Sequence, residues 1–277
     1  MLPQAEYASD TGHGVSPIIY IKYGVSLMAI LLRSRQQIAK MREAGRLVAE
    51  TLELLRPHVR PGVSTRELDQ IAEKFIRSRG ATPVYKGYNG FPATICVAVN
   101  NVICHGFPSK TPLRQGDIVG IDIGAKLNGW VGDSCVTYAV GQISPEAARL
   151  MQVAEESMWR GIRAAQASKR LGDVGAAIQT YVEENGCSIV REWTGHGVGE
   201  KLHEDPSVPH FGKPGSGILL RPGFIFTVEP MVNAGGYATV LAKHDGWTVR
   251  TADGSLSAQF EHSIVITDNG PEILTLP

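Results

Sequence analysis

IDIGAKLNGWVGD, residues 121–133, has the clearest pattern of a β-hairpin in this sequence. Asn128-Gly129 at its centre is a strong signal for a two-residue turn between antiparallel strands. With that turn, Asp133 pairs with Gly124, two positions along from Asp122. The even offset predicts both carboxylates on one face, as diagonal neighbours about 7–8 Å apart at Cα. Two like charges so close favour a bound cation, although an aspartate that only caps a turn is the simpler alternative.

Strand-like and helical patterns alternate around this hairpin. Segments rich in Val, Ile and Thr, typical of strands, cover residues 94–106, 116–127, 130–140, 187–193, 223–232, 247–251 and 258–267. Apolar residues at helical spacing predict helices over residues 36–55, 64–80, 144–166 and 172–184. A capping box at Ser64 and the Ser144-Pro145 pair are helix-start signals. Each half therefore reads helix, helix, strands, which predicts two similar α+β units with antiparallel sheets, outer helices and a crevice between them.

Composition narrows the classes of function. The 277 residues are 43% hydrophobic and 19% charged with a formal net charge of zero, as in an ordinary soluble globular protein. No overall field draws this chain to nucleic acid or to an anionic membrane. Four cysteines without a C-x-x-C pair argue against a zinc ribbon and favour reduced thiols in a cytoplasm. A local basic stretch, interpreted as a solvated helix face with a docking site as the alternative, contains Arg33, Arg35, Lys40, Arg42 and Arg46.

The first 33 residues have no counterpart in these patterns. Their apolar part, residues 16–32, is interrupted by Lys22 and is too short on either side to span a bilayer. It lacks a basic leading region and an A-x-A site, which argues against a signal peptide. We expect residues 1–33 to be a flexible extension and residues 34–277 to be the catalytic domain. A translation start at Met28 is a further hypothesis for this region.

Two more acidic residues interrupt apolar strand segments. Glu229 lies in FIFTVEPM and Glu261 lies in AQFEHSIVIT. A buried carboxylate without a partner is costly, and each of the two alone would more often be an edge or rim residue. Together with Asp122 and Asp133 they make four oxygen ligands on strands. With one imidazole added, this mixed set suits two hard or borderline divalent ions.

The stretch TGHGVGEKLHEDP, residues 194–206, supplies histidines. Its glycines argue against a helix and allow close approach of the backbone, and Pro206 rules out a helical H-E-x-x-H zinc motif. We expect a loop in which His196 and His203 serve different parts of one site, one as a ligand and one as a donor to substrate. His105 in VICHGFP is a third candidate, with a structural role as the alternative. The letters TGHGV recur at residues 11–15, where His13 has no acidic company, and we interpret this as coincidence.

Five separated motifs resemble those of type I methionine aminopeptidases, in order and spacing. They are VNNVICHGFP, GDIVGIDIGAKLNGWVGD, TGHGVGEKLHEDP, FTVEPM and AQFEHSIVITDNG. The resemblance covers residues 34–277 and implies a two-lobed pita-bread fold with pseudo-twofold halves. It also implies a metal-dependent aminopeptidase, a hydrolase that removes the initiator methionine from nascent proteins whose second residue is small. His203 and Glu229 are only 26 positions apart, which leaves no room for the long insertion of type II enzymes.

The resemblance also implies roles for single residues. The metal ligands would be Asp122, Asp133, His196, Glu229 and Glu261. Asp133 and Glu261 would bridge two ions, with cobalt, manganese, iron and zinc all compatible, and a bridging hydroxide would attack the first peptide bond. His203 would contact the scissile amide and His105 the substrate backbone, and Glu229 would be the general base. The methionine pocket would be formed by Tyr85, Tyr88, Phe91, Cys96, Leu202 and Trp247.

Two pocket positions depart from the family pattern. Tyr85 stands where relatives often have cysteine, and Leu202 stands where they often have phenylalanine. The departures concern the shape of the pocket rather than the reaction. For Cys96, simple core packing is an equal alternative.

The nearest rival interpretation is an Xaa-Pro peptidase on the same fold, but such enzymes usually carry an N-terminal domain larger than 33 residues. A metal-free creatinase-like enzyme would lack the acidic set. A non-catalytic relative that binds RNA or protein would typically have lost ligands, and all five are present here. The expected partners are the N-termini of nascent polypeptides, with transient ribosome contact through the basic helix as an option. We expect a cytoplasmic monomer that binds neither membrane nor specific nucleic acid.

Overall fold

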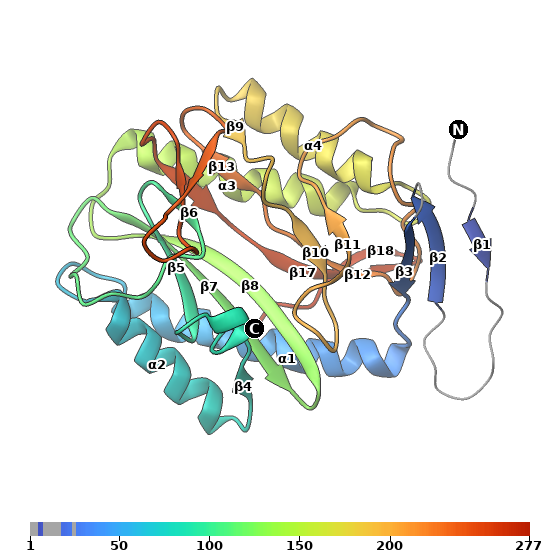
Figure 1. Ribbon diagram of the computed structural model, residues 1–277, viewed down its shortest axis with the longest axis horizontal. Coiled ribbons are helices and arrows are strands. Elements are labelled where there is room, and N and C mark those ends of the chain that lie inside the picture. The colour runs from blue at the N-terminus through green and yellow to red at the C-terminus, as the bar shows by residue number, and fades with distance from the viewer. Residues whose placement is uncertain (1–4, 8–17, 24–25) are drawn as a thin grey trace.

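The structure is a computed structural model that describes the backbone of residues 5–7, 18–23 and 26–277, and the side chains from Ile30 onward. The helices of this part of the chain are α1 (Arg35–Leu55), α2 (Thr65–Ser78), α3 (Pro145–Ala164) and α4 (Leu171–Glu184). Figure 1 shows α1 and α2 along one side of the molecule and α3 and α4 along the opposite side, with strands between them. Among the described residues, no helix has the length and apolar character needed to cross a membrane.

The predicted hairpin is the centre of the first half. It consists of β7 (Ile118–Leu127) and β8 (Trp130–Ala139), and β5 (Ile95–Val99) and β4 (Thr82–Pro83) also pair with β7. Gly124 pairs with Asp133, as predicted. Asn128 and Gly129 both have positive φ, 52° and 87°, which is the conformation that an Asn-Gly hairpin turn requires.

The second half is built around a five-stranded sheet. Its order is β11 (Glu204–Val208), β10 (Gly195–Gly197), β12 (Ile225–Val228), β17 (His262–Thr267) and β18 (Gly270–Ile273). Three smaller sheets have three strands each. One consists of β16 (Ser257–Gln259), β13 (Met231–Asn233) and β9 (Ser188–Ile189), and a second of β14 (Thr239–Leu241), β15 (Val249–Thr251) and β6 (Val102–Cys104). The third consists of β1 (Ala5–Tyr7), β2 (Ile18–Tyr23) and β3 (Ser26–Leu31). The strand pairs of the described chain are antiparallel, so the predicted α+β class is confirmed.

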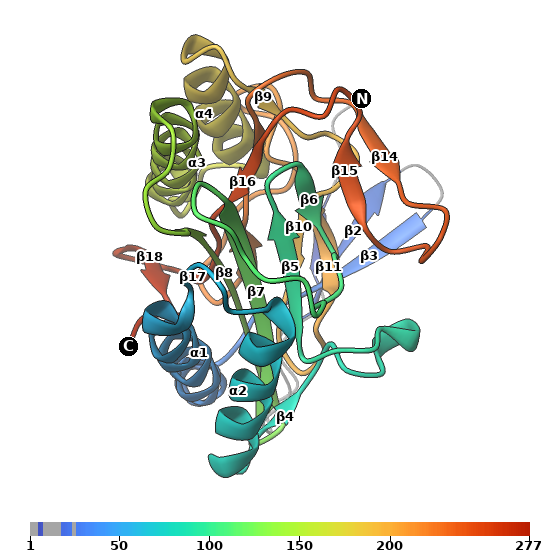
Figure 2. The ribbon, with the colours of Figure 1, turned by 90° about the vertical axis from the view of Figure 1, so that its left-hand side faces the viewer.

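Each half packs its two helices on the outside of its strands (Figure 2). The helix starts follow the predicted caps: Glu67 N–H donates to Ser64 Oγ, and Ala147 N–H donates to Ser144 Oγ. One apolar cluster joins α1 and α2 to β5 and β7, and another joins α3 and α4 to the five-stranded sheet. A Cβ at Gly132 would lie 2.5 Å from the Ala44 carbonyl oxygen, so α1 lies directly on β8. This close packing fixes the strands that hold the acidic residues.

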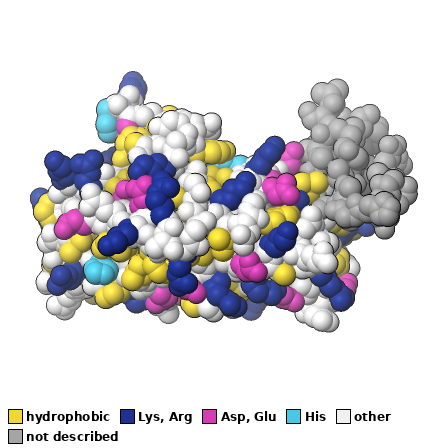
Figure 3. All heavy atoms as spheres, turned by 90° about the horizontal axis from the view of Figure 1, so that it is seen from below, with side chains coloured by type: hydrophobic (Ala, Val, Ile, Leu, Met, Phe, Trp, Pro, Cys, Tyr) yellow, Lys and Arg dark blue, Asp and Glu magenta, His cyan; other side chains and the backbone are white. Residues whose placement is uncertain are grey.

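The chain just before α1 packs onto the second half. Ile30 belongs to the apolar cluster of α3 and α4, and Leu32 forms a bridge with Phe224. The boundary between residues 33 and 34 and the flexible extension stay predictions, and His13 lies outside the described residues. Of the basic stretch, Arg33 is buried and Arg42 pairs with Glu272. On the face in Figure 3, basic and acidic side chains are interspersed, as expected for a solvated surface.

Candidate metal centre

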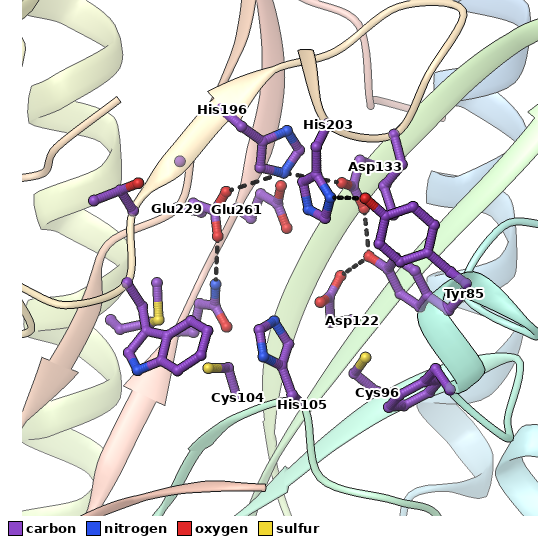
Figure 4. Close-up of a pocket in the computed structure, with 18 of the residues that line it drawn as sticks. Tyr85, Cys96, Cys104, His105, Asp122, Asp133, His196, His203, Glu229 and Glu261 are labelled. Atoms are coloured by element: carbon purple, nitrogen blue, oxygen red, sulfur yellow. Dashed lines mark hydrogen bonds and ion pairs between the residues drawn. The ribbon is translucent and has the colours of Figure 1, made fainter. Parts of the chain in front are cut away.

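Four carboxylates and one imidazole point into a single cavity between the two halves (Figure 4). Asp122 comes from β7 and Asp133 from β8, and Glu229 and Glu261 follow the neighbouring ends of β12 and β16. Glu261 is fixed against β8, because its backbone N–H donates to Cys135 O and Ser134 Oγ donates to its carbonyl. Residues from opposite halves of the chain thus meet at one point, with Asp133 and Glu261 each only 2% exposed.

The Nε2 lone pair of His196 faces the carboxylates of Asp133 and Glu229. Its Nδ1 lies 2.9 Å from the Gly197 carbonyl oxygen, which can only accept, so Nδ1 carries the proton. Nε2 is then an acceptor, and it lies 3.6 Å from Asp133 Oδ2 and 3.5 Å from Glu229 Oε1. Burial lowers the pKa of His196 to about 3, so protonation does not relieve this contact near neutral pH. An acceptor nitrogen facing two carboxylates is a stable arrangement when a cation lies between them.

Glu229 is held by three groups around it. Thr227 Oγ donates to Oε1 at 2.7 Å and Gln259 Nε2 donates to Oε2 at 3.1 Å. The backbone N–H of Glu229 donates to Nε2 of buried His210. Sequence reasoning missed both residues: His210 lies outside the quoted motifs, and Gln259 lies in AQFEHSIVIT but is a neutral amide that did not stand out beside Glu261. Such support around a ligand is what fixes the orientation of metal-binding side chains.

The donor set fits a divalent metal. Ligand atoms of Asp133, His196 and Glu261 lie within 4.8 Å of one another. Glu261 Oε1 is buried and has no hydrogen-bond partner among the described residues. A buried carboxylate oxygen without a donor is costly, and a cation would satisfy it. Carboxylates with one imidazole are ligands that Mn²⁺, Fe²⁺, Co²⁺ and Zn²⁺ accept.

Burial raises the pKa of every carboxyl in this centre. The pKa of Asp122 rises to about 7 and that of Glu229 to about 8, and those of Asp133 and Glu261 lie well above their usual range. A carboxyl whose pKa is higher in the folded state binds its proton more tightly there than in the unfolded chain. Its contribution to the free energy of unfolding is therefore present at low pH and is lost as pH rises toward the folded pKa. The buried histidines have lowered pKa values, so they raise the free energy of unfolding as pH rises, but only below their unfolded pKa of about 6.5.

We therefore expect a rise in pH to destabilise the ion-free protein over a limited pH range. In a chelator, the free energy of unfolding should fall between about pH 6.5 and about pH 8, by about 1.4 kcal/mol per pH unit for each carboxyl that titrates. A saturating divalent ion should abolish this fall. Urea unfolding followed by circular dichroism across the window measures both curves. A flat or rising curve in the chelator would contradict the buried acidic cluster.

Two further histidines face the cavity. His203 Nδ1 lies 2.7 Å from the Tyr88 hydroxyl, and its ring centroid is 4.3 Å from that of His196. His105 follows β6 with a positive φ of 57°, and its ring packs edge-on against Trp193 at 5.0 Å. The short strand Gly195–Gly197 before His203 replaces the loop expected from the glycines. It approaches β12 closely, because a Cβ at Gly195 would lie 2.7 Å from Thr227 O.

An apolar pocket adjoins the acidic cluster. The whole cavity has a volume of about 430 Å³. The six side chains predicted for the pocket belong to one apolar cluster and line this cavity: Tyr85, Tyr88, Phe91, Cys96, Leu202 and Trp247. Phe91 packs edge-on against Trp247 at 5.2 Å. Tyr85 does more than line the wall, because its hydroxyl reaches Asp122 and Asp133. Sequence reasoning did not foresee this contact, nor the place of Trp193 and Cys104 in the lining.

The segment before α1 supports the loop of Leu202 and His203. Arg33 Nη2 lies 2.5 Å from Glu204 Oε2, with side chains only 4% and 13% exposed. The other oxygen of Glu204 accepts from the backbone N–H of Glu200 and of Lys201. One buried ion pair therefore connects the chain before α1 to the loop that ends at the cavity.

Removal of this arginine should destabilise the protein. In Arg33→Met, the carboxylate of Glu204 loses its partner, which should cost about 3 kcal/mol of unfolding free energy. The matched control is Arg42→Met, because Arg42 pairs with Glu272 at the surface and should cost less than about 1 kcal/mol. Urea unfolding of the three proteins measures the difference. Equal losses in the two variants would show that the buried pair has no special role.

Comparisons with known proteins give the family that the chain and its fold match. The sequence model of metallopeptidase family M24 matches residues 39–268. Methionine aminopeptidase 1 of Bacillus subtilis is 53% identical over 247 residues, which cover 89% of this chain and 99% of that protein. The crystal structure of methionine aminopeptidase from Rickettsia prowazekii is 47% identical with a TM-score of 0.88, over 89% of this chain and 100% of the other.

A more distant similarity extends to another activity on the same fold. The Xaa-Pro dipeptidase from Bacillus anthracis is 26% identical with a TM-score of 0.70. The match covers 88% of this chain but only 61% of the dipeptidase. In length and identity, this chain is therefore much more similar to the proteins named methionine aminopeptidase.

Proposed function

Because the chain belongs to metallopeptidase family M24, as a type I methionine aminopeptidase with the pita-bread fold, we propose that two divalent ions in its acidic cluster serve the removal of the initiator methionine. The observation that supports this most is the meeting of five ligand side chains and an apolar pocket in one cavity. The substrate would be a nascent polypeptide whose second residue is small. Nascent chains arise in the cytoplasm, where we expect the enzyme to act as a monomer.

The proposed ligands are Asp122, Asp133, His196, Glu229 and Glu261. Bound divalent ions supply a water of lowered pKa as nucleophile and polarise the carbonyl of the scissile bond. A bridging role for Asp133 is supported by its contacts on two sides, since its Oδ2 lies 3.6 Å from His196 Nε2 and its Oδ1 shares the Tyr85 hydroxyl with Asp122. Glu261 would bridge as well, because its ligand atom lies in the close group with those of Asp133 and His196. Cobalt, manganese, iron and zinc all accept this donor set.

His203 would stabilise negative charge on the scissile carbonyl oxygen. When the Tyr88 hydroxyl donates to Nδ1, the proton of the neutral imidazole is on Nε2. Partial burial lowers the pKa of His203, so the ring is a neutral donor at physiological pH. A fixed N–H aimed at the developing oxyanion lowers the barrier without reorganisation of solvent.

Glu229 and His105 complete the proposed machinery. Glu229 would take a proton from the attacking water and return it to the leaving amine, held in place meanwhile by Thr227 and Gln259. His105 would hydrogen-bond the substrate backbone beyond the scissile bond, at a position fixed by Trp193. Phe91, Cys96 and Trp247 line the apolar part of the cavity, which would receive the methionine side chain.

A peptide assay tests this proposal against its rival. Purified protein is treated with chelator, reloaded with Co²⁺ or Mn²⁺ and given Met-Ala-Ser, Met-Lys-Ser and Ala-Pro-Ser. We expect release of methionine from the first peptide alone. Release of alanine from Ala-Pro-Ser would instead indicate an Xaa-Pro peptidase. Turnover of no peptide would favour a non-catalytic binding protein.

A further inference from the structure

The hydroxyl of Tyr85 lies beside two of the proposed ligands. Its oxygen is 2.6 Å from Asp122 Oδ1 and 2.5 Å from Asp133 Oδ1 (Figure 4). Both distances are those of strong hydrogen bonds between a hydroxyl and a carboxylate. A phenol has one proton and can donate to only one aspartate at a time. The hydroxyl contacts one oxygen of each aspartate. A cation shared by the two aspartates would need the same two oxygens.

The tyrosine ring is held firmly in this position. It is 8% exposed and packs edge-on against Phe91, with centroids 6.3 Å apart. It crosses β7 at Gly124, where an added Cβ would lie 2.9 Å from Cε1 of the ring. The missing side chain at Gly124 is what makes room for the ring. The hydroxyl thus cannot leave the aspartates without disturbing closely packed neighbours.

The contacts of Asp133 separate two parts of the centre. Its Oδ2 faces His196 Nε2 at 3.6 Å, whereas its Oδ1 faces the tyrosine. Among the described residues, the close group of ligand atoms is Asp133, His196 and Glu261, and Asp122 lies outside it. An ion beside His196 would leave the Tyr85 contact intact. An ion beside Asp122 would draw on oxygens that the hydroxyl already contacts.

We propose that Tyr85 is a positioning residue of the metal centre whose hydroxyl weakens binding of the ion shared by Asp122 and Asp133. This inference rests on the two-ion function proposed above. Binding of that ion requires the aspartate oxygens to give up or weaken their hydrogen bond to Tyr85. The free energy of that hydrogen bond is lost on binding, so the ion binds less tightly. Phenylalanine at position 85 would keep the packed ring and remove only the competing oxygen.

Calorimetric titration of Mn²⁺ into chelator-treated protein tests the proposal without an activity measurement. In Tyr85→Phe, the weaker of the two binding events should tighten by about tenfold, the size of one hydrogen bond to a charged group. The tighter event should change by less than about twofold, because its ion does not use the contact. A melting curve of each ion-free protein verifies that the variant is folded.

Tyr88→Phe is the matched control, since it removes a hydroxyl in the same cavity that contacts His203 rather than a carboxylate. Both binding events should be unchanged in it. If the wild-type protein binds two ions and Tyr85→Phe binds them with unchanged or weaker affinity, the role of Tyr85 is refuted while the two-ion site stands. If the wild-type protein binds no ion at this centre, both proposals fail.

Discussion

Asp133→Asn and Glu261→Gln should each abolish ion binding at the centre and lower kcat/KM by about a thousandfold or more, since the ions contribute several kcal/mol to catalysis. Both residues lie where the two halves of the chain meet, and each is 2% exposed. Neither change should unfold the ion-free protein. An amide has nearly the same shape as the carboxyl and cannot ionise, so it adds no like charge to the crowded, buried cluster.

Three measurements on the same preparations separate these effects: bound metal by elemental analysis, peptide turnover, and urea unfolding in chelator. Glu146→Gln is the control, because Glu146 is an exposed acid in the first turn of α3, away from the cavity. It should match the wild-type protein in all three. Full metal content and turnover in Asp133→Asn would contradict the assignment of the ligands.

His203→Ala should lower kcat by about 10²- to 10³-fold, the usual cost of losing one donor to an oxyanion. The KM and the bound metal should change little, because His203 contacts Tyr88 and the cavity rather than the acids. This pattern differs from that of a lost ligand, in which the metal content falls together with the rate.

Tyr88→Phe provides the graded comparison for His203. It leaves the imidazole in place but removes the hydrogen bond that orients it, so a loss of about tenfold in kcat is expected. Steady-state kinetics with Met-Ala-Ser and metal analysis test both variants. An unchanged kcat in His203→Ala would exclude the proposed role in stabilising the oxyanion.

Local sequence signals predicted the framework of the centre well. The Asn128-Gly129 turn fixes the register of its hairpin, so the shared face of Asp122 and Asp133 follows from residues only a few positions apart. The helices follow from apolar spacing and from caps such as Ser64, which act within one turn. Carboxylates inside apolar strands stood out because their burial demands a partner.

Contacts between distant segments could not be predicted in this way. Arg33 and Glu204 are 171 positions apart, and the pairing depends on how the chain before α1 packs on the second half. The hydroxyl of Tyr85 reaches the aspartates because the ring crosses β7 above Gly124, which no local pattern encodes. The split of the strands into several small sheets likewise depends on pairings between remote segments.

Anomalous diffraction from crystals grown with Mn²⁺ would locate the ions of the proposed centre. We expect two peaks about 3.5–4 Å apart, as in other two-metal sites. Both should contact Asp133 and Glu261, one beside Asp122 and the other beside His196 and Glu229. A single peak, or peaks ligated by other residues, would contradict a two-ion centre built from these five side chains.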